Sequence, residues 1–110
     1  MEHLLRRLRS FRDRRDWAQF HTPKDLAISV SVEAAELLEL FQWAPADAPP
    51  DEKLIENAAS EAADVLIYLM LFADQLGFDL LDSANKKVAE NERRFPEARS
   101  FGVAKPAKDN

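Results

Sequence analysis

Two apolar stretches, Val32–Leu40 (VEAAELLEL) and Ala59–Leu69 (ASEAADVLIYL), each carry two acidic residues three positions apart. The two pairs are Glu33 with Glu36 and Glu61 with Asp64. Residues at positions i and i+3 share one face of an α-helix, so each pair directs two carboxylates the same way. A carboxylate in an apolar stripe loses its hydration unless another group compensates the charge. The two stretches therefore predict two helices whose apolar faces carry acids.

The remaining sequence favours a protein built only of helices. It has two glycines, long runs of good helix formers and no alternation of β-branched residues. Between the two acidic stretches, Ala44–Pro50 (APADAPP) contains three prolines and cannot continue a helix. We therefore expect an all-α fold of four helices, at about residues 2–17, 23–43, 51–76 and 79–94.

Capping residues define the expected helix ends. Thr22 is a good N-cap, Pro23 suits the first helical position, and Asp25 completes an acidic variant of the capping box. Gly77 fits the left-handed position after the third helix, and Pro96 stops the fourth. These signals agree with the helical pattern of the segments that they bound.

Residues 1–96 are expected to form one domain, and residues 97–110, which lack helical periodicity, are expected to form a flexible tail. All eight residues of the run 65–72 are hydrophobic, so the third helix should be central or lie at a subunit interface. That run is too short for a membrane span, which needs about 20 apolar residues. With no signal peptide in the sequence, we expect a cytoplasmic protein.

The charges are unevenly distributed along the chain, whose formal net charge is −5. Six arginines fall within the first fifteen residues, and we interpret them as the solvated face of the first helix. Between Asp25 and Asp64 there are ten acids and one base. This acidic middle argues against binding to nucleic acid polymers. The absence of cysteine excludes disulfide bonds and thiolate catalysis.

Two interpretations of the acidic pairs remain open at this point. Glutamate is abundant on helices, so the four acids can simply belong to solvated surfaces. If instead the two helices face each other, four carboxylates converge and need cations between them. Oxygen ligands suit Mg²⁺ or Mn²⁺, whereas ferritin-like di-iron sites use a Glu-x-x-His motif that neither pair has.

Four local strings carry a resemblance to a known family. They are RDWAQFHTPKDL (15–26), VEAAELLELFQW (32–43), SEAADVLIYL (60–69) and NERRFP (91–96). In this order they resemble the MazG-like all-α nucleotide pyrophosphohydrolases, and most closely the dCTP pyrophosphatase branch. The motif of that family is ExxE, a variable spacer and then ExxD. The residues that match it are Glu33, Glu36, Glu61 and Asp64.

This resemblance implies a fold, an activity and a cofactor. The four-helix MazG-like bundle is expected to be completed by oligomerisation, as a homodimer or homotetramer. The implied reaction is the Mg²⁺-dependent hydrolysis of a nucleoside triphosphate, dCTP or a modified dCTP, to the monophosphate and pyrophosphate, which cleans the nucleotide pool. Mn²⁺ is the expected substitute for Mg²⁺. The residues implied as both metal ligands and catalytic groups are Glu33, Glu36, Glu61 and Asp64.

The resemblance also implies two sets of substrate-binding residues. Those expected around the nucleoside are Trp17, Ala18, Gln19, Phe20, His21, Trp43 and Tyr68. Those expected near the phosphates are Lys87, Asn91 and Arg94. The residues alone leave other roles open: core packing for the aromatic side chains, a local hydrogen bond for His21, and a solvated basic face on the fourth helix.

Leu8 departs from the pattern of the dCTP branch, which carries a histidine at the aligned position of the first helix. This change weakens the expectation of strict cytosine specificity, so dUTP or an oxidised nucleotide is an alternative substrate. An alternative from another functional class is a helical interaction module without catalysis. Divalent cations distinguish the two classes, because only a metal site predicts cation-dependent stabilisation.

Overall fold

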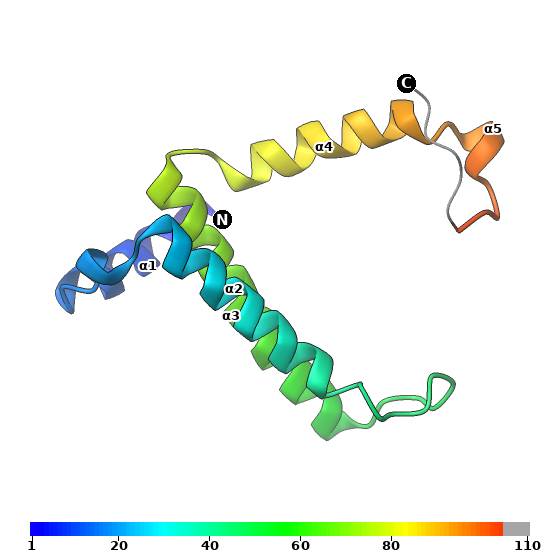
Figure 1. The fold of residues 1–110 in the computed structure, drawn as a ribbon, viewed down its shortest axis with the longest axis horizontal. Helices are drawn as coiled ribbons and strands as arrows, with labels where there is room; N and C mark the ends of the chain where they lie inside the picture. The colour runs from blue at the N-terminus through cyan, green and yellow to red at the C-terminus, as the bar shows by residue number, and fades with distance from the viewer. Residues whose placement is uncertain (105–110) are drawn as a thin grey trace. The chain divides into compact units, whose positions relative to one another are not determined.

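The computed structural model describes residues 1–104, and this part of the chain contains helices and no strand (Figure 1). The elements are α1 (Glu2–Arg14), the short 3₁₀-helix η1 (Ala18–Phe20), α2 (Pro23–Glu39), α3 (Glu52–Leu76), α4 (Leu80–Arg94) and α5 (Glu97–Ser100). The expected all-α class is therefore confirmed, and each of the four expected helices is present. The chain divides into two compact units, one from Met1 to Gly77 and one from Phe78 onward.

α1 ends at Arg14, three residues before the expected end. Asp16 adopts the left-handed conformation, with a φ of 53°, and thereby stops the helix. Its N–H donates to the Asp13 carbonyl at 3.1 Å, and the Trp17 N–H donates to the Arg12 carbonyl at 3.0 Å. These two hydrogen bonds form a Schellman motif in which an aspartate takes the position that glycine usually occupies. The motif turns the chain, so Trp17 does not continue the helix.

α2 and α3 lie side by side as an antiparallel pair in the first unit (Figure 1). Thr22 caps α2 by accepting a hydrogen bond from the Asp25 N–H, and Asp51 caps α3 by accepting one from the Leu54 N–H. Gly77 follows α3 with a φ of 79°, as its place in the sequence predicted. The two long helices therefore begin and end on local signals.

α2 ends at Glu39, four residues before the expected end. The N–H groups of Leu40 and Phe41 donate to carbonyls three residues earlier, so the helix tightens into turns. Pro45 follows closely, and a proline disfavours the helical conformation of the residue before it. Trp43 consequently lies in the connection to α3.

The buried core of the first unit is small. Within residues 1–104, the buried hydrophobic side chains are Leu26, Met70, Leu71 and Ala73. They come from the first turn of α2 and the C-terminal half of α3, and α1 also contacts α3. Leu66, inside the hydrophobic run 65–72, remains 38% exposed. One chain therefore covers this run only in part.

The second unit contains α4 and α5. Asp79 caps α4 by accepting a hydrogen bond of 2.8 Å from the Asp82 N–H, and Pro96 follows the helix closely, as predicted. Residues 97–100, placed in the expected tail, form α5. The expectation for residues 105–110 lies outside the described part of the chain. Among residues 1–104, no helix combines the length and the hydropathy needed to cross a membrane.

Candidate functional site

Three of the four motif acids converge where α2 and α3 face each other. Glu33 comes from α2, whereas Glu61 and Asp64 come from α3, and one carboxylate oxygen from each lies within 4.8 Å of the others. We call these three residues the acid cluster. Their side chains are half-buried. Because residues i and i+3 share a helix face, the pairing of the two helices brings both motifs to one place.

Glu36, the fourth motif acid, lies at the edge of the acid cluster. It is exposed, and none of its oxygens belongs to the converging set. The carboxyl group of Glu36 nevertheless raises the pKa of Glu33. Glu36 therefore adjoins the cluster without being enclosed in it.

The acid cluster is electrostatically unfavourable without a counter-ion. The carboxyl group of Glu36, burial and the charges of the neighbouring acids raise the pKa of Glu33 to about 7. Burial is the main cause that raises the pKa of Glu61. Oε2 of Glu33 and Oε2 of Glu61 are buried and have no hydrogen-bond partner among the described residues. Buried oxygens that lack a donor fit a site for a cation.

The ligand atoms that the acid cluster offers indicate the kind of cation that fits. All of them are carboxylate oxygens, and neither a histidine nor a thiolate belongs to the cluster in the described part of the chain. Carboxylate ligands favour hard divalent cations such as Mg²⁺, Mn²⁺ and Ca²⁺ over softer metals. The cluster could therefore hold a divalent ion of this class.

A cavity of about 810 Å³ lies between α1 and α3 and reaches the acid cluster. Asp64 lines this cavity and also belongs to the cluster. Tyr68 lines it one helical turn further along α3, and Trp17 and His21 line it from the segment that joins α1 to α2. The cavity walls combine aromatic and apolar side chains with arginines of α1 and adjoin a possible cation site, so the cavity suits a ligand with one flat end and one anionic end.

The residues expected around a nucleoside divide into two groups. Those that line the cavity are Trp17, His21 and Tyr68. The other three form η1: Ala18, Gln19 and Phe20. They are exposed and are not among the residues that line the cavity. Gln19 Nε2 donates to the Asp16 carbonyl at 3.0 Å and to Asp16 Oδ2 at 2.9 Å, so this side chain supports the turn after α1. Leu8, where the resemblance predicts a histidine, also lines the cavity.

Trp43 lies apart from these three residues. Its side chain is 88% exposed in the connection between α2 and α3, and it is not part of the described cavity lining. A tryptophan this exposed is unusual for a side chain of its size, which more often buries most of its surface. Its role near a nucleoside stays a prediction.

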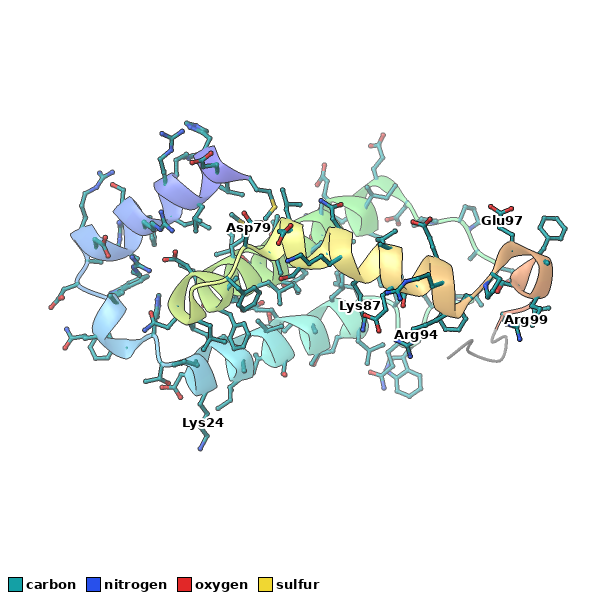
Figure 2. The ribbon with its side chains drawn as sticks, turned by 90° about the horizontal axis from the view of Figure 1, so that it is seen from above. Lys24, Asp79, Lys87, Arg94, Glu97 and Arg99 are labelled. Carbon is teal, nitrogen blue, oxygen red and sulfur yellow. The ribbon has the colours of Figure 1, made fainter. Side chains whose placement is uncertain are left out.

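Lys87, Asn91 and Arg94 belong to α4 in the second unit. Figure 2 shows Lys87 and Arg94 on this helix. Lys87 Nζ lies 3.5 Å from Glu90 Oε2, and Arg94 Nη1 lies 3.1 Å from Glu90 Oε1. The charge of Lys87 is the main cause that lowers the pKa of Glu90. The two basic side chains therefore lie on one face of α4, as their spacing predicted, and their role near phosphates stays a prediction.

The interpretation of the α1 arginines as a solvated face is wrong for Arg12. Its side chain is 13% exposed, and Nη1 donates to Oδ2 of Asp74 on α3 at 3.1 Å. Arg9 binds the other oxygen of Asp74, with Nε at 3.0 Å from Oδ1. An acid directly after the apolar run 65–73 was the available signal, since such an acid needs a cationic partner from another element.

Aromatic contacts also extend the cavity wall beyond the residues that the sequence singled out. The guanidinium of Arg15 lies over the ring of Phe11, 3.7 Å from its centroid. The rings of Phe11 and Trp17 meet edge to face, with centroids 5.6 Å apart and an interplanar angle of 75°. All three residues line the cavity, so Trp17 is held within a packed group.

Comparisons with known proteins agree with this geometry. A model of the MazG-like family matches residues 28–109. dCTP pyrophosphatase 1 from Bos taurus is 40% identical over 105 residues, which cover 91% of this chain and 62% of that protein. The protein of the same name from Homo sapiens is 40% identical over 97 residues, which cover 84% and 57%. The chain thus spans about three fifths of the length of the curated relatives that it matches.

A solved structure resembles this chain over nearly its whole length. It is a pyrophosphatase from Archaeoglobus fulgidus, with 44% sequence identity and a TM-score of 0.78. The match covers 87% of this chain and 92% of that one. Since the family model matches well over half of the chain and both acidic motifs lie within the match, this all-α chain belongs to the MazG-like family.

Proposed function

We propose that the chain is a divalent-metal-dependent nucleoside triphosphate pyrophosphohydrolase, which releases pyrophosphate from a (d)NTP and leaves the monophosphate. One observation carries this proposal: Asp64 belongs to the acid cluster and also lines the cavity that holds Trp17, His21 and Tyr68. A ligand that occupies the cavity therefore adjoins a possible metal site. The relatives, dCTP pyrophosphatase 1 and a pyrophosphatase from Archaeoglobus fulgidus, support the same activity.

Glu33, Glu61 and Asp64 are the proposed metal ligands, and Glu36 is the proposed fourth one at the solvent edge. The proposed cofactor is Mg²⁺, with Mn²⁺ as a substitute, because the donors are all oxygens and both ions prefer oxygen. When bound, such an ion neutralises charge on the phosphates and helps an attacking water lose a proton. The two buried oxygens without donors support this assignment.

The side chains of this chain supply the remaining requirements of the reaction. One carboxyl group of the four accepts the proton that the attacking water loses, and no serine or cysteine nucleophile is needed. Asp64 connects the two ends of the site, since it faces both the cluster and the cavity. Lys87, Asn91 and Arg94 are proposed to bind the outer phosphates: the two basic side chains would neutralise their charge, and the amide of Asn91 would donate a hydrogen bond.

The cavity is proposed to hold the base and sugar. The rings of Trp17 and Tyr68 offer flat surfaces for stacking, and His21 offers a ring nitrogen, Nδ1, that is buried without a partner among the described residues. Ala18, Gln19, Phe20 and Trp43 complete the proposed set. The substrate is proposed to be dCTP or a modified dCTP, as the names of the curated relatives suggest. Leu8 leaves dUTP or an oxidised nucleotide as the alternative.

A panel of nucleoside triphosphates tests the activity directly. Purified protein is incubated with each nucleotide and Mg²⁺, and monophosphate and pyrophosphate are measured together. We expect a deoxycytidine triphosphate to have the highest kcat/KM. Glu61→Gln should lower kcat/KM by more than the roughly 10–100-fold that is typical when a residue hydrogen-bonded to a metal ligand is lost, because Glu61 is a proposed ligand itself. Glu56→Gln removes an exposed acid of α3 outside the cluster and is the matched control.

If no nucleotide yields pyrophosphate, or if Glu61→Gln retains the wild-type rate, the proposed activity is wrong. The rival function is a non-catalytic helical interaction module. It predicts that Mg²⁺, alone or with nucleotide, leaves the melting temperature unchanged, whereas the proposed enzyme is stabilised by both together.

We also propose that the chain works as a homodimer or homotetramer in the cytoplasm, on free nucleotides rather than nucleic acid. The small core supports self-association: the apolar side chains exposed on α2 and α3 include Ile28, Val32, Leu38, Ile55 and Leu66. Contiguous apolar surface on a small domain commonly marks a subunit interface. In sedimentation equilibrium, the assembly formed by Leu66→Lys should have a lower mass than that of the wild type, and the assembly formed by Glu56→Lys should not. Equal masses for the wild type and both variants contradict this interface.

A further inference from the structure

Ion pairs to Asp74, together with half-buried packing, attach α1 to α3. No residue of α1 is fully buried. The two oxygens of Asp74 bind different arginines: Oδ1 accepts from Arg9, and Oδ2 accepts from Arg12. These arginines, Arg9 first, lower the pKa of Asp74, so the carboxylate is ionised at neutral pH. The ion pairs to Asp74 therefore add to the half-buried packing that holds α1 against α3.

The two arginines on Asp74 differ in their surroundings. The Arg9 side chain is 46% exposed, and Arg9 is not part of the described cavity lining. The Arg12 side chain is largely enclosed, lines the cavity and also binds Asp13 through Nε at 2.9 Å. Of the two arginines that bind Asp74, only Arg12 also lines the cavity.

Arg12 is also connected to the segment that carries the cavity side chains. Its carbonyl accepts the hydrogen bond from the Trp17 N–H that closes the turn after α1. Arg12 and His21 both line the cavity, and after burial the charge of Arg12 also lowers the pKa of His21. One residue thus contacts α3 with its side chain and fixes the chain that leads to Trp17 and His21.

We propose that Arg12, anchored by Asp74, is a positioning residue for nucleotide binding that holds Trp17 and His21 in the cavity wall. This inference rests on the proposed function and adds to it a residue that does not touch the reacting atoms. Loss of the ion pair lets the end of α1 move away from α3, while the acid cluster on α2 and α3 keeps its geometry. Nucleotide affinity falls, and the chemical step is nearly unaffected.

Steady-state kinetics of Arg12→Gln and Arg9→Gln provide the matched test, with the nucleotide that the wild-type protein cleaves best. Arg12→Gln should raise KM about tenfold with kcat within about twofold of wild type, because ground-state binding alone is weakened. Arg9→Gln removes an arginine from the same carboxylate outside the cavity and should raise KM by less than about threefold. Asp74→Glu, which keeps the charge, should remain closer to wild type than Asp74→Asn.

Amide hydrogen exchange without nucleotide separates this inference from the proposed activity. Arg12→Gln should speed exchange in residues 17–21 more than Arg9→Gln does, with exchange in α2 and α3 as in wild type. If the wild type cleaves no nucleotide, the proposed function fails and the exchange data still decide whether Arg12 positions this segment. Should Arg12→Gln not fold, Arg12→Lys serves in the same comparisons. The inference is overturned if the Arg12 and Arg9 variants exchange alike in residues 17–21, or if Arg12→Gln lowers kcat and leaves KM unchanged.

Discussion

Glu33 on α2 and Glu61 on α3 each bury one carboxylate oxygen, Oε2, that has no hydrogen-bond partner within residues 1–104. Two such acids on facing helices oppose the association of those helices, because like charges repel and buried oxygens lack water. The most unfavourable electrostatic feature of the first unit is thus also its best candidate site. Such a conflict between stability and local chemistry is expected at functional sites.

The first prediction concerns the stability of the acid cluster. In a chelator, Glu61→Gln should raise the melting temperature by roughly 2–5 °C, because a neutral amide replaces a carboxylate that repels its neighbours. With Mg²⁺ and nucleotide, the wild type should gain stability and the variant should not. Differential scanning calorimetry measures both, with Glu56→Gln as the control. If Glu61→Gln has a lower melting temperature than wild type in the chelator, the carboxylates do not repel each other as proposed.

The second prediction concerns pH. The pKa of Glu33 is 4.5 in the unfolded chain and about 7 in the folded one, so the folded state binds more protons between these values. The stability that Glu33 contributes in a chelator is therefore present below pH 4.5 and lost as the pH rises to about 7. His21, whose pKa is lowered by burial and by Arg12, acts in the opposite direction over part of this range. Urea unfolding of wild type and Glu33→Gln isolates the Glu33 contribution, which is absent if both proteins show the same pH dependence.

The third prediction concerns base selection at Leu8. Leu8→His places a polar ring in the cavity wall where the resemblance predicts one. The ratio of kcat/KM for dCTP over dUTP should rise about tenfold, as one added hydrogen bond to the base would give. Leu4→His changes a cavity residue one turn earlier and should leave the ratio as in wild type. Equal ratios in the two variants would show that position 8 does not read the base.

The fourth prediction concerns the turn after α1. Asp16 has a φ of 53°, a conformation that costs a non-glycine residue about 1–2 kcal/mol. Asp16→Gly removes this cost and loses the hydrogen bond from Gln19, so its free energy of unfolding should stay within about 1 kcal/mol of wild type. Asp16→Val keeps the cost and adds β-branching, and it should destabilise by about 2 kcal/mol. Denaturant unfolding checks both, and a Val variant as stable as Gly contradicts the strained turn.

Helix caps were predictable from sequence because they depend on neighbouring residues. Thr22 and Gly77 act where the sequence placed them, and Asp51 and Asp79, expected as the first residues of their helices, are the N-caps. The end of α1 was not predictable, because aspartate takes the left-handed position less often than glycine does. Nothing in the local pattern of helix formers distinguishes Asp16 from a helical residue.

The facing of the two acidic motifs was predictable in part. Their i, i+3 spacing placed each pair on one helix face, and Glu33, Glu61 and Asp64 indeed converge. The exposure of Glu36 and the binding of Arg12 to Asp74 were not predictable, because they depend on how whole helices pack. Arg12 and Asp74 are 62 residues apart, and residue patterns do not report contacts over such separations.

The antiparallel pairing of α2 and α3 has a consequence for how the chain folds. Glu33 and Glu61 lie on opposite sides of the proline-rich connection, so an ion bound by both closes a loop of the chain in the way that a crosslink does. Because the ion binds only where the helices are paired, its binding free energy stabilises the paired state, and does so more as the ion concentration rises. The cation would then act as a reversible staple, slowing the separation of the hairpin and making its lifetime a function of divalent ion concentration.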